Sequence, residues 1–142
     1  EEEDVSALAE YVDQALEGFT GYYNNLSSNI QVLATNYKQY APTLLKNKRV
    51  VAKFESLQQS VVDLEDDLQT IQAYSLTGSY DEARLFLEDN QELMGELSVK
   101  INKDLEYLGK QLKPYIEKAQ KAAKAKAAKA KAKAKTTSTT KR

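Results

Sequence analysis

The feature that most constrains the fold is a repeat of apolar residues at every seventh position. In the first 40 residues it forms two rows: Val5, Val12, Phe19, Leu26, Leu33 and Tyr40 in one, and Ala9, Leu16, Tyr23, Ile30 and Tyr37 in the other. Two such rows form one face of an α-helix, as in a coiled coil. Only 5 Gly and 2 Pro occur in 142 residues, which also favours long helices over a sheet. The pattern predicts an all-α protein.

Two further segments repeat this pattern. The second carries Val50, Leu57, Leu64 and Ile71, and the third carries Tyr80, Leu87, Met94, Ile101, Leu108 and Tyr115. Short connections favour antiparallel neighbours, and three apolar stripes can close one core. We therefore predict an antiparallel three-helix bundle over residues 1–113, with helices at about 4–40, 44–76 and 79–112. A coiled coil that completes itself by forming a homodimer is the alternative architecture.

Local signals place the helix ends. Pro42 disfavours helix at Ala41, so the first helix should end near Tyr40 and restart at or near Thr43. Gly78 suits the left-handed residue after a helix end. Ser79 suits an N-cap, and Glu82 completes a capping box. We interpret this segment as a structural turn.

The third helix has its own stop signal. Pro114, with Gly109 upstream, is expected to kink or end that helix, which places the domain boundary between residues 110 and 116. Gly18 and Gly21 in the first helix are interpreted as tolerated weak spots, with a bend or a close approach between helices as the alternative.

The near-zero net charge of the chain conceals two oppositely charged parts. Residues 1–112 contain 20 Asp and Glu against 9 Lys and Arg, whereas residues 113–142 contain 1 against 11. The sequence thus predicts an acidic body followed by a Lys/Ala-rich tail, 114–142, which is helical or disordered and has no core of its own.

The lysines of this tail are the candidate binding residues. They are spread around a helix rather than lining one face: Lys121, Lys124, Lys126, Lys129, Lys131, Lys133 and Lys135. Such a segment can neutralise nucleic acid, a glycosaminoglycan, a cell-wall polymer or an anionic membrane surface in many registers. It lacks interleaved aromatic or Arg residues, which disfavours reading of a base sequence. A solvated tail that aids solubility, or links to a further part of the protein, is the alternative.

Several classes of chemistry lack the residues they need. The chain has no Cys and no His, which excludes thiolate chemistry, zinc bound through sulfur or imidazole, and a histidine base. No nucleophile motif or phosphate-binding glycine loop is present. Asp104 and Asp81 are the acids nearest to an apolar face. We expect no enzyme activity and no cofactor.

Other candidate features have simpler interpretations. The acidic cluster Asp63, Glu65, Asp66 and Asp67 lacks the spacing of an EF-hand loop and is interpreted as a solvated face without a metal. Tyrosines in the heptad rows are expected in the core with their hydroxyls in water: Tyr23, Tyr37, Tyr40, Tyr80 and Tyr115. Those outside the rows could face a partner: Tyr11, Tyr22 and Tyr107.

Residues 53–87 resemble a repeat of the septation ring regulator EzrA, through a helix, a Gly-x-Tyr-x-x-Ala-Arg turn and a second helix. The resemblance covers about a quarter of the chain. It implies a spectrin-like bundle that acts as a non-catalytic scaffold in bacterial cell division, and it assigns Gly78, Tyr80, Ala83 and Arg84 to a structural turn. The acidic coiled domain and Lys/Ala tail are also similar to the mycobacterial heparin-binding adhesin, whose tail is usually interrupted by Pro.

These features favour a structural or interaction module that binds protein partners and uses its tail to contact an anionic partner. The alternative is a polyanion-binding protein in which the tail is active and the bundle is a spacer. A small-molecule carrier, the third class, would need a cavity near Gly18, Gly21 or Gly95. No stretch is apolar enough for a membrane span. The chain begins without Met and is interpreted as a processed form or a piece of a longer protein, so the bacterial cytoplasm and the cell surface both fit.

Overall fold

The protein is built from three long helices. The structure, a computed structural model, describes residues 2–140, and it describes the side chains of residues 5–133. The elements are α1 (Glu2–Tyr40), a 3-10 helix η1 (Pro42–Lys46), α2 (Lys48–Leu76) and α3 (Tyr80–Thr140). Residues 2–140 contain no strand. The all-α prediction and the number of helices are confirmed.

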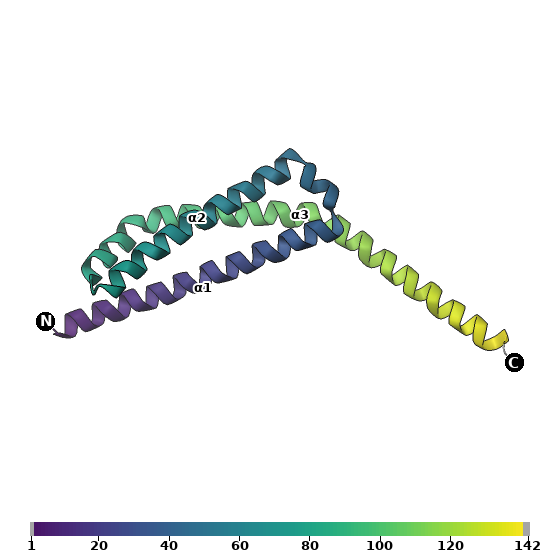
Figure 1. Cartoon of the computed structure of the whole chain (residues 1–142), viewed down its shortest axis with the longest axis horizontal. Coiled ribbons are helices and arrows are strands. Elements are labelled where there is room, and N and C mark those ends of the chain that lie inside the picture. The colour runs from purple at the N-terminus through teal and green to yellow at the C-terminus, as the bar shows by residue number, and fades with distance from the viewer. Residues whose placement is uncertain (1, 141–142) are drawn as a thin grey trace.

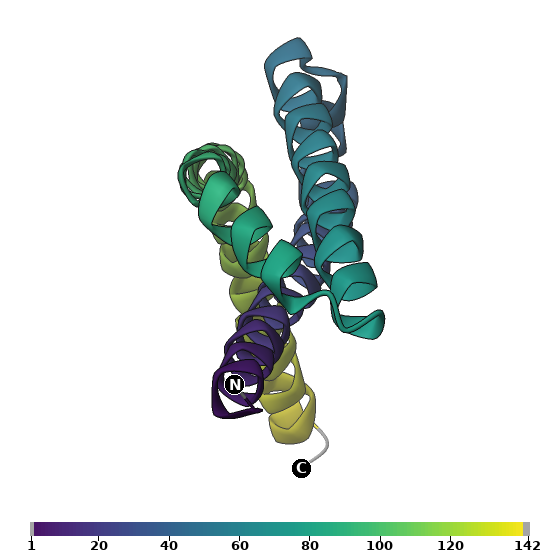
Figure 2. The same cartoon turned by 90° about the vertical axis from the view of Figure 1, so that its left-hand side faces the viewer.

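The three helices pack against one another along most of α1 and α2. Each of the three helix pairs is in contact. Figure 1 shows the chain running along α1, back along α2 and forward again along α3, with the N-terminus and the α2–α3 turn at the same end. Viewed from that end, the helices occupy the corners of a triangle rather than a flat layer (Figure 2). No helix in the described part of the chain is both long and apolar enough to cross a membrane.

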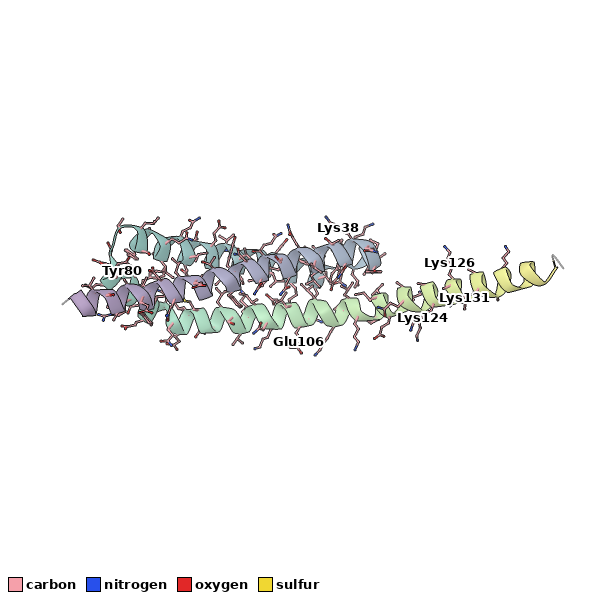
Figure 3. The ribbon with its side chains drawn as sticks, turned by 90° about the horizontal axis from the view of Figure 1, so that it is seen from below. Lys38, Tyr80, Glu106, Lys124, Lys126 and Lys131 are labelled. Atoms are coloured by element: carbon pink, nitrogen blue, oxygen red, sulfur yellow. The ribbon has the colours of Figure 1, made fainter. Side chains whose placement is uncertain are left out.

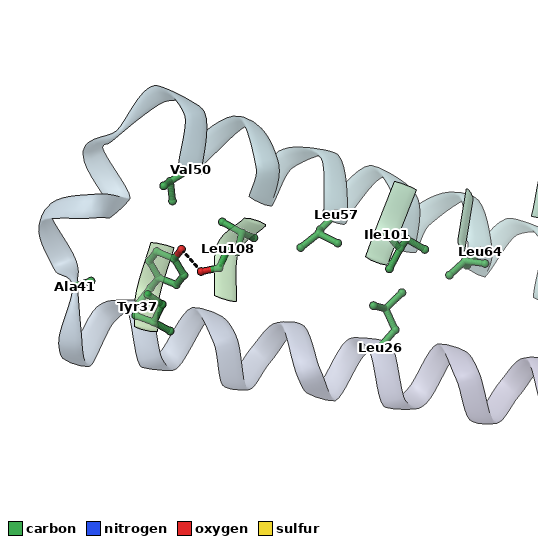
Figure 4. Packing of buried hydrophobic residues seen from close by; sticks show 9 residues of the cluster. Leu26, Tyr37, Ala41, Val50, Leu57, Leu64, Ile101 and Leu108 are labelled. Atoms are coloured by element: carbon green, nitrogen blue, oxygen red, sulfur yellow. Dashed lines mark hydrogen bonds between the residues drawn. The ribbon is translucent and has the colours of Figure 1, made fainter. Parts of the chain in front are cut away.

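The core follows the predicted heptad rows. The α2 row is buried along its whole length, at Val50, Leu57, Leu64 and Ile71. Leu57 and Leu64 face Leu26 of α1 and Ile101 of α3 in the main cluster (Figure 4). Each fully buried side chain of this size contributes about 1.5–3 kcal/mol. A second, smaller cluster around Val12, Ile71 and Ala83 closes the end that holds the α2–α3 turn.

The α1–α2 connection differs from the prediction. The first helix ends at Tyr40, as expected, but Pro42 opens the 3-10 helix and α2 begins at Lys48 rather than near 44. The reason is Asn47, whose side-chain oxygen accepts hydrogen bonds from the main-chain N–H groups of Arg49 (2.9 Å) and Val50 (3.3 Å). An Asn in this position satisfies N–H groups that have no partner within the helix. The structure therefore places the helix start at the stronger cap.

The α2–α3 turn is a Schellman motif. Gly78 has φ of +71°, its N–H donates to the carbonyl of Ser75 (3.2 Å), and the N–H of Ser79 donates to that of Tyr74 (2.8 Å). These two bonds satisfy carbonyl groups at the end of α2. The Ser79 hydroxyl pairs with that of Thr77 at 2.9 Å, in place of the side-chain capping that we expected. The left-handed role predicted for Gly78 is confirmed.

α3 does not end at the predicted domain boundary. We expected the third helix to span about 79–112 and Pro114 to kink or end it, but α3 continues through Pro114 to Thr140. Pro114 removes one backbone donor, but Leu112 is buried and Ile116 packs against the main cluster, so tertiary contacts hold both sides of the proline. Downstream, Ala and Lys are strong helix formers. Figure 1 shows α3 changing direction where it leaves the other two helices.

Candidate functional site: the lysine extension

The last part of α3 lies outside the bundle. Leu112 is buried, Ile116 and Ala119 are half-buried, and every side chain from Gln120 to Lys133 is exposed. The helix thus passes from core to solvent within about two turns of 3.6 residues. Figures 1 and 3 show this segment projecting beyond the end of α1 and α2. We call residues 120–140 the lysine extension.

The predicted binding lysines all fall on the lysine extension. Six have exposed side chains: Lys121, Lys124, Lys126, Lys129, Lys131 and Lys133. The side chain of Lys135 lies outside the described ones. Figure 3 shows Lys124 and Lys126 on different sides of the helix. These lysines share a helix that the bundle anchors at one end, so a partner can approach them from several directions.

The lysines do not surround the helix completely. At about 100° per residue, Ala123, Ala127 and Ala130 fall on one strip without lysine. Each lies 11 positions after a residue of the bundle face, namely Leu112, Ile116 and Ala119. A spacing of 11 residues is close to three helical turns, so this strip continues the core-facing side of α3. Sequence reasoning missed the strip because it treated the tail as separate from the third helix.

A surface hollow lies at the opposite end of the molecule. Its volume is about 970 Å³, and it is lined by Val5, Ala7, Leu8 and Tyr11 of α1 and by Gly78, Tyr80, Asp81, Arg84 and Glu88 of the turn and α3. We call it the end groove. Val5 is 59% exposed and Tyr11 50% exposed, so its α1 side presents apolar surface to solvent. Residues from α1, the α2–α3 turn and α3 together create this groove, which no local pattern could predict.

The predicted turn residues divide between core and groove. Ala83 is buried and Tyr80 packs against the second core cluster. Glu82 is exposed. Arg84 is exposed, and its Nε lies 3.9 Å from Oε1 of Glu88, one turn further along α3. The structural role is supported for Gly78, whereas Tyr80 and Arg84 also line the end groove.

The buried carboxylate Asp104 links α3 to α2. Ser56 Oγ donates a hydrogen bond of 2.6 Å to Asp104 Oδ2, and Lys53 Nζ lies 3.4 Å from Oδ1. The same ammonium lies 5.6 Å from the centre of the Tyr107 ring. Both carboxylate oxygens therefore have partners, which fits a structural group better than a general base. The sequence placed Asp104 on an apolar face but gave no sign of its partners, which lie three residues apart on α2.

The acidic cluster on α2 is a solvated surface. Asp63, Glu65 and Asp66 are exposed, and the amide of Gln59 donates to Asp63 at 3.0 Å. Partial burial raises the pKa of Asp67, and the nearby charges of Asp63 and Asp66 raise it further. Among the described residues, no group of three or more acidic side chains is arranged to hold a metal ion.

The glycines suggested as marks of a cavity or a close helix approach lie in open space. A Cβ atom added at Gly18, Gly21 or Gly95 would meet no neighbouring heavy atom within 4 Å. The idea of a close helix approach at Gly18 and Gly21 was therefore wrong.

The tyrosines outside the heptad rows differ in their exposure. Tyr11 and Tyr22 are exposed, whereas Tyr107 packs against the core.

No family model matches the chain, and no curated protein or solved structure matches it significantly.

Proposed function

We propose that the protein is a non-catalytic scaffold, an antiparallel and spectrin-like three-helix bundle that binds protein partners and contacts an anionic partner through its lysine extension. The observation that carries this proposal is the full exposure of residues 120–133 on a helix whose preceding turns are packed in the core. The bundle holds the base of the extension, so the lysines are presented away from the acidic body. The resemblance of residues 53–87 to an EzrA repeat supports the scaffold role.

The lysine extension suits a partner that is recognised by charge. Lysine is a compact cation on a flexible stem, and the segment 120–135 contains only Lys, Ala and Gln. Without aromatic rings or Arg it has no platform for stacking bases. We therefore propose that it binds anionic polymers or acidic proteins without selecting a sequence. If a polymer is the physiological partner, the extension is the active element and the bundle is a spacer.

A matched pair of variants tests the role of the extension. In the extension variant, five exposed lysines of α3 become Gln: Lys121, Lys124, Lys126, Lys129 and Lys131. In the body variant, five exposed lysines of the bundle become Gln: Lys38, Lys46, Lys48, Lys100 and Lys103. Both changes remove five positive charges, and Lys and Gln have similar helix propensities.

The measurement is the salt concentration that elutes each protein from immobilised heparin. We expect the extension variant to elute at much lower salt than the wild type, and the body variant to elute close to it, because local charge density governs the contact. Equal losses in the two variants would mean that only total charge matters, and the proposal would be wrong. Circular dichroism checks that both variants keep their helices.

A further inference from the structure

The fold sorts charge to the two ends of the molecule. Of the residues that the structure describes, 2–17 and 55–96 together contain 17 Asp and Glu and one Arg, whereas 18–54 and 97–140 contain 17 Lys and Arg and three acids. The start of α1, the end of α2 and the start of α3 meet at one end, and the α1–α2 connection lies at the other (Figure 1). Figure 3 shows Tyr80 at the first end and Lys38 at the second. The molecule therefore has an acidic end and a basic end.

The end groove lies at the acidic end. Its apolar lining includes exposed Val5 and Tyr11. On its α3 side lie the carboxylates of Asp81 and Glu88, and Arg84, whose Nε is 3.9 Å from Glu88. Exposed apolar surface beside carboxylates suits a partner that offers a small apolar strip between cations. A purely electrostatic contact would not need the apolar surface of Val5 and Tyr11.

The lysine extension offers both a small apolar strip and cations on either side of it. Its strip of Ala123, Ala127 and Ala130 is free of lysine, and side chains as small as alanine allow a helix to approach a surface closely. Lys124 and Lys131 fall beside the strip on one side, and Lys126 falls on the other, at about 100° per residue. Such a helix can place its alanines over Tyr11 while its lysines reach Asp81 and Glu88.

A single copy cannot make this contact with itself. Tyr80 at the groove and Ala123 on the extension belong to the same continuous helix, α3. Their separation of 43 residues corresponds to roughly 65 Å at 1.5 Å per residue. The extension also projects away from the acidic end (Figure 1). Any contact between the two must therefore join different molecules.

We propose that the lysine extension of one copy docks in the end groove of a second copy. This inference rests on the proposed function, since it names a second copy as one anionic partner of the extension. The contact is head-to-tail, because it joins two different surfaces, and a pair of copies still has one free groove and one free extension. Such contacts produce rings when they close and open chains when they do not. The assembly should weaken as salt screens the charges.

Complementary variants of the full chain test this contact. The groove variant carries Tyr11→Ser, Asp81→Asn and Glu88→Gln, all at exposed positions, and the extension variant is the one defined above. Sedimentation equilibrium at low salt should show that the wild type forms assemblies of more than two chains as its concentration rises. Each variant alone should be monomeric. An equal mixture should form 1:1 pairs, because one variant supplies the only intact extension and the other the only intact groove.

Other outcomes overturn the inference. A monomeric wild type at low salt, self-association of the groove variant like that of the wild type, or a mixture that stays monomeric would each exclude the head-to-tail contact. Heparin elution separates this failure from that of the proposed function. A groove variant that elutes like the wild type, beside an extension variant that elutes early, would leave the proposed function standing. An extension variant that keeps wild-type heparin affinity would overturn both.

Discussion

The hydroxyl of Tyr37 on α1 donates a hydrogen bond of 2.6 Å to the main-chain carbonyl oxygen of Leu108 on α3. Figure 4 shows this bond between two residues that are both fully buried. The Tyr37 ring also meets Phe54 of α2 edge-to-face, with the ring centres 5.2 Å apart. One side chain thus contacts all three helices. It lies near the point where α3 leaves the bundle, so it helps to hold the base of the lysine extension.

Replacing Tyr37 with Phe should lower the stability of the bundle. The substitution keeps the ring packing but removes the buried hydrogen bond to Leu108, and such a bond contributes about 1 kcal/mol. Chemical denaturation followed by circular dichroism measures the loss. Tyr22→Phe is the control, since Tyr22 is 38% exposed and should tolerate the change. Equal stability of the Tyr37→Phe variant and the wild type would show that the bond contributes nothing.

Alkaline pH should destabilise the wild type through the same residue. Burial raises the pKa of Tyr37 to about 12, with a smaller contribution from Tyr107. The folded state therefore keeps its proton between about pH 10 and 12, where the unfolded chain has lost it. This stabilisation is complete below about pH 10 and is lost as the pH rises towards 12, to the extent of roughly 2–3 kcal/mol.

The Tyr37→Phe variant isolates this effect. Its free energy of unfolding, measured between neutral pH and pH 12, should fall less steeply than that of the wild type. If both proteins lose the same stability over that range, other groups cause the alkaline transition.

The buried carboxylate should matter more than an exposed one on the same helix. Asp104→Ala removes the acceptor for half-buried Ser56 and the ion pair with Lys53. A hydrogen bond to a charged group contributes about 1.5–3 kcal/mol. Glu106→Ala, two residues away, should leave the midpoint of thermal unfolding almost unchanged. Glu106 is exposed and pairs with Lys110, at 2.9 Å. A larger effect at Glu106 than at Asp104 would contradict the structural role of Asp104.

Two glycine substitutions should act in opposite directions. Gly78→Ala should cost about 1 kcal/mol, because Gly78 has φ of +71° and a Cβ atom disfavours that conformation. Gly95→Ala should add up to about 1 kcal/mol of stability, because Gly95 lies inside α3. Neither new methyl group would meet an atom within 4 Å, so backbone preference alone decides the sign. Thermal unfolding of both variants checks this, and stabilisation by Gly78→Ala would contradict the turn geometry.

The sequence predicted the features that depend on repeated apolar positions or on a short local motif. The heptad rows led to the buried α2 row from Val50 to Ile71, and the Gly78 signal gave the turn, because both depend on neighbours along the chain. The start of α2 was misplaced because Asn47 competes with Thr43 as a cap, and only the folded backbone shows which one is used. Tyr37 was expected to keep its hydroxyl in water, whereas its acceptor lies 71 residues away.

The end of α3 and the candidate site show a further limit. Pro114 is a strong stop signal locally, but buried Leu112 and half-buried Ile116 hold the helix on both sides of it. The lysines of the extension were found from composition. The alanine strip depends on α3 continuing without interruption, and the end groove depends on α1 meeting the α2–α3 turn, so neither followed from a local pattern.

The central claim is that the lysine extension presents cations to a polyanion. The most direct test is the salt dependence of binding to a labelled DNA duplex. The logarithm of the association constant should fall linearly with the logarithm of the salt concentration, with a slope near −0.9 for each neutralised phosphate. If all five substituted lysines contact the duplex, the extension variant should have a slope shallower by roughly 4–5, and the body variant should match the wild type. A slope and affinity unchanged in the extension variant would contradict the claim.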